Sequence, residues 1–322
     1  MTSTVSVEVH PSQFPDRVQK ELIQCLRERR IAPKFHYQSY KQSQKWQAVY
    51  EAWSPFRNDS DCAEIYDGAF AEAAKLVNDG PVRVVGLGCG TGDKEARLLG
   101  LLAREGREVS YSPCDTSLGL VLTASEKARE STPSVLCSPV LCDFAAAGDL
   151  SSLFGRFEER RIFTFFGIIP NLEPGDIVPR LAALLRPGDI LLFSANLAPG
   201  RDYGTGVLRV LPGYDNAETR DWLLTFLFDM GVEPGDGALE ISIQDAGVFK
   251  RIVADFHFAR ERGLTVFGER IEFWEGESIR LFFSYRYRPE MIAKLPGAQR
   301  LKIAGQWISK SEEEGVFLCK LG

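Results

Sequence analysis

The sequence is poor in the residue types that build metal centres and disulfide frameworks. It contains only three histidines, and His10, His36 and His257 do not stand at the spacings of metal ligands. Its seven cysteines are an odd number, with no Cys-x-x-Cys pair among them. We therefore expect neither a disulfide framework nor a metal site.

The chain also lacks long apolar runs and an excess of positive charge. No run approaches the roughly 18 apolar residues that a membrane helix needs, and the first residues, MTSTVSVEVHPSQFPDR, do not resemble a secretory signal. The formal net charge is −6, which gives no general attraction for nucleic acid or anionic lipid. We expect a cytoplasmic protein, a monomer or simple homodimer, without nucleic-acid or membrane partners.

The pattern of apolar residues changes along the 322 residues and predicts two domains. Residues 62–198 alternate buried-strand runs with amphipathic helices, which favours an open, mostly parallel sheet with helices on both faces. Residues 287–322 add two strands as an antiparallel C-terminal edge. Residues 1–61 are helical and aromatic, and residues 199–286 contain a helix and four extended stretches. We predict an α/β fold with a second, α+β domain formed by these last two segments.

A glycine-rich segment carries the most specific signal. Val84–Gly92 reads VVGLGCGTG, and glycines after a buried strand let backbone approach a ligand at the carboxyl end of a sheet strand. Gly86, Gly88 and Gly90 form G-x-G-x-G rather than the G-x-G-x-x-G of dinucleotide loops, with Gly86 at a position that is usually acidic. We assign these glycines and Thr91 to a cofactor loop; a tight turn without a ligand is the alternative.

Two carboxylates follow at the ends of the next two predicted strands. Asp115 stands where an acidic residue can accept both hydroxyls of a ribose. Asp143 can accept from an adenine amino group, and the ring of Phe144 can cover the base. Each aspartate by itself is also a good helix N-cap. With no Walker sequence present, the combination indicates an adenosine-containing ligand that lacks a pyrophosphate.

These motifs resemble class I S-adenosylmethionine methyltransferases, and more narrowly the histidine-specific methyltransferase domain family, typified by the L-histidine Nα-methyltransferases of the ergothioneine pathway. The similarity extends over nearly the whole chain. The matching segments are PKFHY (33–37), SPFRND (54–59), GLGCGTGDK (86–94), CDTS (114–117), CDF (142–144), FFGIIPNLEP (165–174) and GYDNAETR (213–220).

The resemblance implies a cofactor, a division of labour between the domains and three further site residues. S-adenosylmethionine would bind to the domain of residues 62–198 and 287–322, and the other domain would bind the substrate. Lys94 would lie near the methionine carboxylate of the cofactor. Asn171 would hold the amino and carboxylate groups of the substrate, and Tyr37 would line the substrate cavity; these two are the catalytic candidates.

The chain departs from the family at positions that would contact the substrate. A tyrosine pair of the family is Trp53-Ser54 here, and a glutamate that reads the histidine ring is Phe282, although Ser284 is kept. Losing a buried acceptor leaves an imidazole N–H unpaired at a cost of about 1–3 kcal/mol. We therefore doubt that histidine is the substrate. The residues assigned to the substrate are Trp53, Ser54, Phe56, Asn171, Tyr214, Phe282 and Ser284.

The sequence thus predicts methyl transfer from S-adenosylmethionine to a small molecule, with the amino nitrogen of an amino acid or related amine as acceptor. One alternative is a non-catalytic or regulatory protein that binds S-adenosylmethionine on the same fold. A nicotinamide-dependent oxidoreductase is a third hypothesis, against which the G-x-G-x-G spacing argues.

Overall fold

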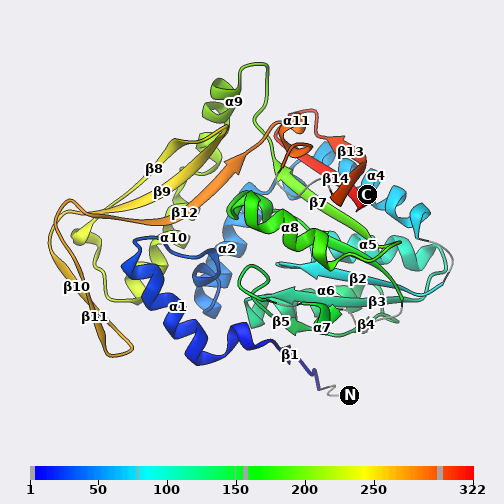
Figure 1. Ribbon diagram of the computed structural model, residues 1–322, viewed down its shortest axis with the longest axis horizontal. Helices are drawn as coiled ribbons and strands as arrows, with labels where there is room; N and C mark the ends of the chain where they lie inside the picture. The colour runs from blue at the N-terminus through cyan, green and yellow to red at the C-terminus, as the bar shows by residue number, and fades with distance from the viewer. Residues whose placement is uncertain (1–3, 78–79, 149, 155–158, 296–299) are drawn as a thin grey trace. The chain divides into compact units, whose positions relative to one another are not determined.

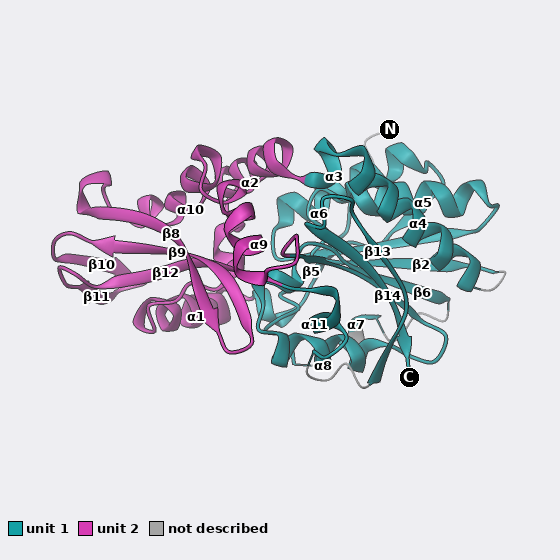
Figure 2. Ribbon diagram, turned by 90° about the horizontal axis from the view of Figure 1, so that it is seen from above, with its two compact units in different colours: residues 1–13, 55–197, 287–322 teal, residues 14–54, 198–286 magenta. Residues whose placement is uncertain are grey.

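The helices and strands of the chain divide into two units. In the computed structural model, which describes residues 4–77, 80–148, 150–154, 159–295 and 300–322, unit 1 is made of residues 1–13, 55–197 and 287–322. Unit 2 is made of residues 14–54 and 198–286 (Figure 2).

Unit 1 is built on a large, mostly parallel sheet (Figure 1). The strand order is β1-β5-β3-β2-β6-β7-β14-β13, with β4 beside β3. The strands up to β7 run parallel, whereas β14 lies antiparallel to β7 and to β13. This confirms the predicted α/β fold and its antiparallel C-terminal edge. The strands are β1 (Glu8–Val9), β2 (Val82–Leu87), β3 (Val109–Asp115), β4 (Leu136–Cys137), β5 (Val140–Leu141), β6 (Arg160–Phe165), β7 (Ile190–Asn196), β13 (Leu301–Ile308) and β14 (Glu314–Leu321).

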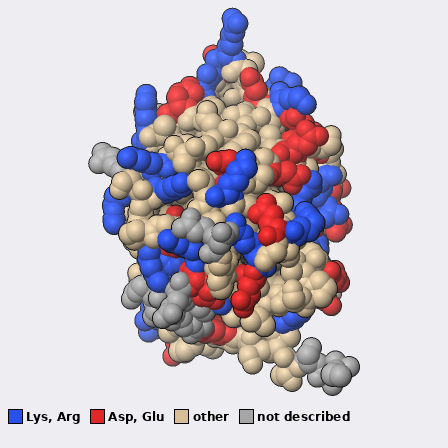
Figure 3. All heavy atoms as spheres, turned by 90° about the vertical axis from the view of Figure 1, so that its right-hand side faces the viewer, with Lys and Arg blue, Asp and Glu red and all other residues tan. Residues whose placement is uncertain are grey.

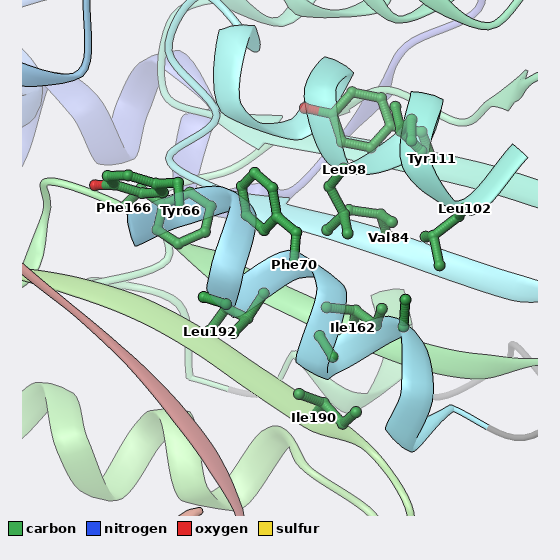
Figure 4. Close-up of a cluster of buried hydrophobic side chains, with 14 of the residues drawn as sticks. Tyr66, Phe70, Val84, Leu98, Leu102, Tyr111, Ile162, Phe166, Ile190 and Leu192 are labelled. Atoms are coloured by element: carbon green, nitrogen blue, oxygen red, sulfur yellow. The ribbon is translucent and has the colours of Figure 1, made fainter. Parts of the chain in front are cut away.

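Helices cover both faces of this sheet. Successive side chains of β7 point to opposite faces, and each set packs against a helix. Ile190 and Leu192 belong to the core cluster that also contains α4 side chains (Figure 4). Leu191 and Phe193 point to the other face, where they line an apolar cavity with α8. The helices of unit 1 are α3 (Pro55–Asn58), α4 (Ser60–Leu76), α5 (Asp93–Arg104), α6 (Leu118–Ser131), α7 (Ser151–Phe154), α8 (Pro174–Leu184) and α11 (Pro289–Ile292), with 3-10 turns η1 (Pro11–Gln13) and η3 (Ile169–Asn171).

The structure differs from the predicted pattern in two places near β5. The apolar run at residues 134–144 reads as one strand but forms the short strands β4 and β5, because Pro139 between them has no N–H to donate to a ladder. Residues 1–61 are expected in the second domain, but residues 1–13 and 55–61 belong to unit 1. Glu8–Val9 pairs parallel with Val140–Leu141.

Unit 2 contains two separate antiparallel sheets rather than one four-stranded meander. β9 lies between β8 and β12, and β10 pairs only with β11. The run at 264–274 reads as one extended stretch, but Phe267 and Gly268 both adopt positive φ, and the chain folds back there into a hairpin. The elements are α1 (Pro15–Arg27), α2 (Tyr40–Trp53), α9 (Tyr203–Val210), α10 (Ala217–Asp229), β8 (Gly237–Ala246), β9 (Phe249–Phe258), β10 (Arg262–Val266), β11 (Glu269–Phe273) and β12 (Ser278–Arg286), with η2 (Pro33–His36), η4 (Leu211–Gly213) and η5 (Pro234–Asp236).

The surface carries charges of both signs. On the face drawn in Figure 3, lysine and arginine side chains are interspersed with aspartate and glutamate among the described residues. This mixture is typical of a solvated face rather than of a field of one sign. None of the described helices is both long and apolar enough to cross a bilayer.

A buried ion pair in unit 1 provides a test of what stabilises the sheet. The Nε of Arg161 lies 3.2 Å from Asp189 Oδ1, a terminal guanidinium nitrogen also donates to this carboxylate, and both side chains are buried. Asp189→Ala leaves the guanidinium charge uncompensated, and we expect the free energy of unfolding in urea to fall by about 3–5 kcal/mol. Glu72→Ala, which breaks the exposed pair with Lys75, is the control and should cost less than about 1 kcal/mol. Equal losses in the two variants would show that the buried pair does not stabilise unit 1.

Candidate functional site

The glycine loop leaves β2 along a path that side chains would obstruct. Gly88, Gly90 and Gly92 have φ values of +64°, +51° and +74°, in the left-handed region that favours glycine. A Cβ on Gly88 would lie 2.2 Å from Cδ1 of Ile168, and one on Gly92 would lie 2.8 Å from Cα of Ala124. The loop therefore packs against α6 and against the FFGIIPN segment, so two of the predicted site segments meet in unit 1.

Asp115 connects the glycine loop to the end of β3. One carboxylate oxygen accepts from the backbone N–H of Gly90 at 3.1 Å, and the other accepts from the N–H of Ser117 at 3.0 Å. Burial raises the pKa of this carboxyl, and the backbone donors oppose the shift. The N-cap of α6 is Ser117, whose hydroxyl accepts from Leu120, rather than Asp115. The aspartate is thus a loop anchor and not a helix cap.

Asp143 and Phe144 follow β5 at the same edge of the sheet. Asp143 Oδ1 accepts from the N–H groups of Ala145 and Ala146, at 2.9 and 3.1 Å. Phe144 is buried and contacts Phe165 edge to face at a centroid distance of 5.5 Å. These local contacts are those of a turn, so the predicted contacts with adenine stay a prediction.

The remaining cofactor candidates differ in their surroundings. Thr91 donates to Asp93 at 2.8 Å, whereas Lys94 Nζ donates to the hydroxyl of Tyr66 at 2.8 Å. Gly86 is buried inside β2, and a Cβ there would lie 3.0 Å from the hydroxyl of Tyr111. The space next to this usually acidic position is therefore filled by a tyrosine of the neighbouring strand.

Glu95, which the sequence does not mark, is a buried carboxyl next to the loop. It lies in the first turn of α5 and accepts from the Thr164 hydroxyl at 2.7 Å. Burial raises its pKa from 4.5 to about 7, and the hydrogen bond from Thr164 opposes the shift. Acidic residues are common in the first turn of a helix, where they are solvated and complement the helix dipole. The sequence therefore does not single out Glu95 as a site residue.

Two predicted substrate residues belong to unit 1. Asn171 closes η3, where its N–H donates to the carbonyl of Ile168 at 2.9 Å. Phe56 is buried in the core cluster and contacts Tyr66 edge to face at a centroid distance of 5.1 Å. Asn171 is thus tied through Ile168 to the glycine loop, and Phe56 packs within the core.

Four other candidates form one aromatic group in unit 2, joined by Trp222. The ring of Trp222 lies 5.5 Å from Tyr37 and 6.0 Å from Phe282, and Phe282 lies 6.2 Å from Tyr214. The Tyr214 hydroxyl lies 3.0 Å from that of Ser284. We call these five residues the aromatic group.

His36 holds part of this group in place. Its Nε2 bonds the carbonyl of Leu281 in β12 at 2.7 Å, and its own carbonyl accepts from the indole N–H of Trp222 at 3.0 Å. Burial lowers the pKa of the imidazole to about 4, so the ring is neutral and donates this bond. The histidine therefore fixes η2, and with it Tyr37, against β12 and α10.

Trp53 and Ser54 lie at the C-terminal end of α2 instead. Trp53 is 44% exposed, and its indole donates to Glu218 at 3.1 Å. The N–H of Ser54 donates to the carbonyl of Tyr50 as the helix ends. Their contacts are those of a helix end, and a substrate role for them stays a prediction.

No group of three histidine, cysteine, aspartate or glutamate side chains within the described ranges is arranged to hold a metal ion. The cysteines in these ranges are all free thiols.

The chain matches a family of methyltransferases that depend on S-adenosylmethionine. The family model described as "Histidine-specific methyltransferase, SAM-dependent" matches residues 18–219, and the chain belongs to this family. Its cofactor is therefore S-adenosylmethionine. A search of curated protein sequences finds no match.

Solved structures similar to this chain include methyltransferases of several kinds. CcbJ from Streptomyces caelestis shares 14% identity over 80% of this chain and 89% of its own, with a TM-score of 0.41. The S-adenosylmethionine-bound amino pentose methyltransferase CalS10 from Micromonospora echinaspora shares 13% over 85% and 97%, with a TM-score of 0.40. The mitomycin 7-O-methyltransferase MmcR shares 12% over 97% and 70%, with a TM-score of 0.41. Similarities this distant do not identify an acceptor.

The buried Glu95 makes stability depend on pH in a defined direction. Because its folded pKa of about 7 exceeds the ordinary value of 4.5, its contribution to stability is complete below about pH 4.5 and is lost as the pH rises through about 7. Glu95→Gln stays neutral at every pH. Relative to this variant, the wild type should lose on the order of 3 kcal/mol between about pH 5 and about pH 8. Parallel urea denaturation series measure the difference, and a difference that does not change with pH would contradict the assignment.

Proposed function

We propose that the protein transfers a methyl group from S-adenosylmethionine to the amino nitrogen of a small amine or amino acid other than histidine. The observation that carries the proposal is the hydrogen bond from the Gly90 amide to the buried Asp115 carboxylate, together with the packing of Ile168 over Gly88. These contacts join the glycine loop, the end of β3 and the segment of Asn171, which supports assigning the cofactor and the acceptor to this part of unit 1.

The residues present fit an adenosyl ligand. Left-handed glycines leave positions 88 and 90 of the loop without side chains, so the backbone there can approach a ligand closely. We assign the ribose hydroxyls to Asp115 and the adenine to Asp143 and Phe144. We assign Gly86 and Thr91 to the cofactor loop and Lys94 to the methionine part, with the ammonium of Lys94 opposite the carboxylate. When bound, the cofactor supplies a methyl group on a sulfonium, so the protein needs no nucleophile of its own.

Asn171 is assigned to the acceptor amine. An ammonium has no lone pair to attack with, so the acceptor amine must first give a proton to water. The amide oxygen of Asn171 can then accept one N–H of the neutral amine, while the lone pair of its nitrogen stays available for methyl transfer. Orientation of the nucleophile is the contribution that this residue makes to the rate. Tyr37 is assigned a role in lining the acceptor cavity.

The aromatic group of unit 2 is assigned to the side chain of the acceptor, together with Trp53, Ser54 and Phe56. Phe282 stands where the resemblance places a carboxylate, and rings of Trp222 and Tyr214 flank it. An imidazole would find no acceptor on Phe282, whereas an apolar or aromatic side chain can stack there. We therefore propose an amine with a bulky apolar or aromatic group.

Asn171→Ala tests the acceptor site. We expect release of S-adenosylhomocysteine to fall at least about a hundredfold with a panel of amines, because the amine is no longer oriented. Affinity for S-adenosylhomocysteine by calorimetry should stay within about twofold of the wild type. Turnover at the wild-type rate would remove Asn171 from the site. Tight cofactor binding without turnover of any amine by the wild type would favour the non-catalytic alternative.

Asp115→Ala tests the cofactor site. Removal of a charged acceptor for two hydroxyls should weaken S-adenosylhomocysteine binding by about tenfold to a hundredfold. Asp115→Asn keeps the volume and an oxygen acceptor for the Gly90 amide but removes the charge. Comparison of the two variants therefore distinguishes the effect of losing the loop anchor from the effect of losing the charge. Wild-type affinity in the alanine variant, with an unchanged melting temperature, would place the ribose elsewhere.

A further inference from the structure

Lys94 lies in an aromatic and acidic environment inside unit 1. Its Nζ is 4.5, 5.5 and 5.6 Å from the ring centroids of Tyr66, Phe56 and Phe166. The side chain is only 14% exposed, and Glu314 Oε1 lies 3.8 Å from Nζ. The ammonium of this lysine is therefore largely enclosed by aromatic rings and a carboxylate. One of the rings, Phe166, belongs to the FFGIIPN segment that also contains Asn171.

The hydroxyl of Tyr66 stands between the lysine and the glutamate. It donates its single proton to Glu314 Oε1 and accepts from Lys94 Nζ at 2.8 Å. Burial, and then the neighbouring carboxylate, raise the pKa of Tyr66 well above its ordinary value, so the hydroxyl keeps its proton. The other oxygen of Glu314 accepts from the Cys62 thiol at 3.6 Å. The carboxylate is thus occupied by neutral donors on both oxygens.

In this arrangement the lysine donates to Tyr66 and makes no direct hydrogen bond to Glu314. The distance of 3.8 Å from Nζ to Oε1 exceeds that of a hydrogen bond, although the charges still attract. An ammonium has three donors, and the tyrosine takes one of them. If the hydroxyl were absent, the strongest acceptor within reach would be Glu314, and the ammonium would move onto it.

We propose that Tyr66 is a positioning residue that holds Lys94 away from Glu314 and so keeps its charge available for the carboxylate of S-adenosylmethionine. The proposal rests on the proposed function, which assigns Lys94 to that carboxylate. It adds two residues, Tyr66 and Glu314, that lie 248 positions apart in the chain. Figure 4 shows Tyr66 beside Phe166, at one end of the side chains drawn from the core cluster.

The test compares two ligands that differ in the amino-acid part. S-adenosylhomocysteine carries the carboxylate, whereas 5′-methylthioadenosine keeps the adenosine and the thioether without it. In Tyr66→Phe we expect calorimetry to give a loss of about tenfold in affinity for the first ligand and less than about twofold for the second. Unchanged affinity for both, or an equal loss for both, would overturn the proposal.

A second substitution distinguishes capture of the lysine from a packing defect. In Tyr66→Phe/Glu314→Gln the acceptor that captures Lys94 is neutral, so affinity for S-adenosylhomocysteine should return to within about threefold of the wild type. A double variant as weak as the single one would overturn the proposal. Tyr111→Phe is the matched control: this tyrosine is also fully buried in the core of unit 1, and its hydroxyl has no hydrogen-bond partner among the described residues. It should bind both ligands as the wild type does.

Lys94→Met keeps the test decisive if Tyr66→Phe does not fold. It should lower affinity for S-adenosylhomocysteine alone, and an unchanged ratio of the two affinities would overturn the proposal. Failure of the wild type to bind S-adenosylhomocysteine at all would refute the proposed function itself. Normal binding by the wild type, combined with a contrary result in the Tyr66 variants, would refute only the role of Tyr66. An unchanged ratio in Lys94→Met would also remove Lys94 from the cofactor carboxylate.

Discussion

The hydrogen bond between the Gly90 amide and the Asp115 carboxylate is the contact on which the site depends. It connects the ends of two adjacent strands, because Gly90 belongs to the loop after β2 and Asp115 is the last residue of β3. A buried carboxylate is costly unless donors surround it, and here two backbone N–H groups do so. The loop must therefore keep the conformation that presents the Gly90 amide, and this conformation is the left-handed one that glycine supplies.

Sequence patterns were sufficient for features that are set by local chemistry. The runs ending at Leu87 and Asp115 are wholly buried strands, and their apolar composition and terminal glycine or aspartate mark both the strands and their ends. Since parallel strands present their carboxyl ends at one edge, the loop and the two aspartates could be placed together in advance. The family membership and cofactor followed from the same motifs.

Features that depend on distant pairing could not be predicted in this way. Two residues, Glu8–Val9, carry too little pattern to reveal a strand, and they are defined only by their partner β5. The hairpin of β10 and β11 forms a sheet apart from β8, β9 and β12. The alternation of apolar and polar residues along these strands does not reveal that division. In the sequence Tyr66 reads as an ordinary helix residue and Glu314 as the end of a charged turn. Their relation to Lys94 exists because α4, α5 and β14 meet.

The glycine at position 86 has a physical explanation in the groups around it. The Tyr111 hydroxyl occupies the space that a side chain at 86 would enter. Two carboxyls already lie near Tyr111. Burial is the largest cause of the raised pKa of this tyrosine, and the charges of Glu95 and Asp115 raise it further. Burial also raises the pKa of each of these two acids, which means that the surroundings hold negative charge poorly. A third carboxylate at 86 would add like-charge repulsion and a further desolvation penalty. A glycine at 86 is therefore compatible with the nearby Glu95 and Tyr111. The loop is anchored to β3 by the Asp115 carboxylate and by the backbone bond from Cys89 to Cys114.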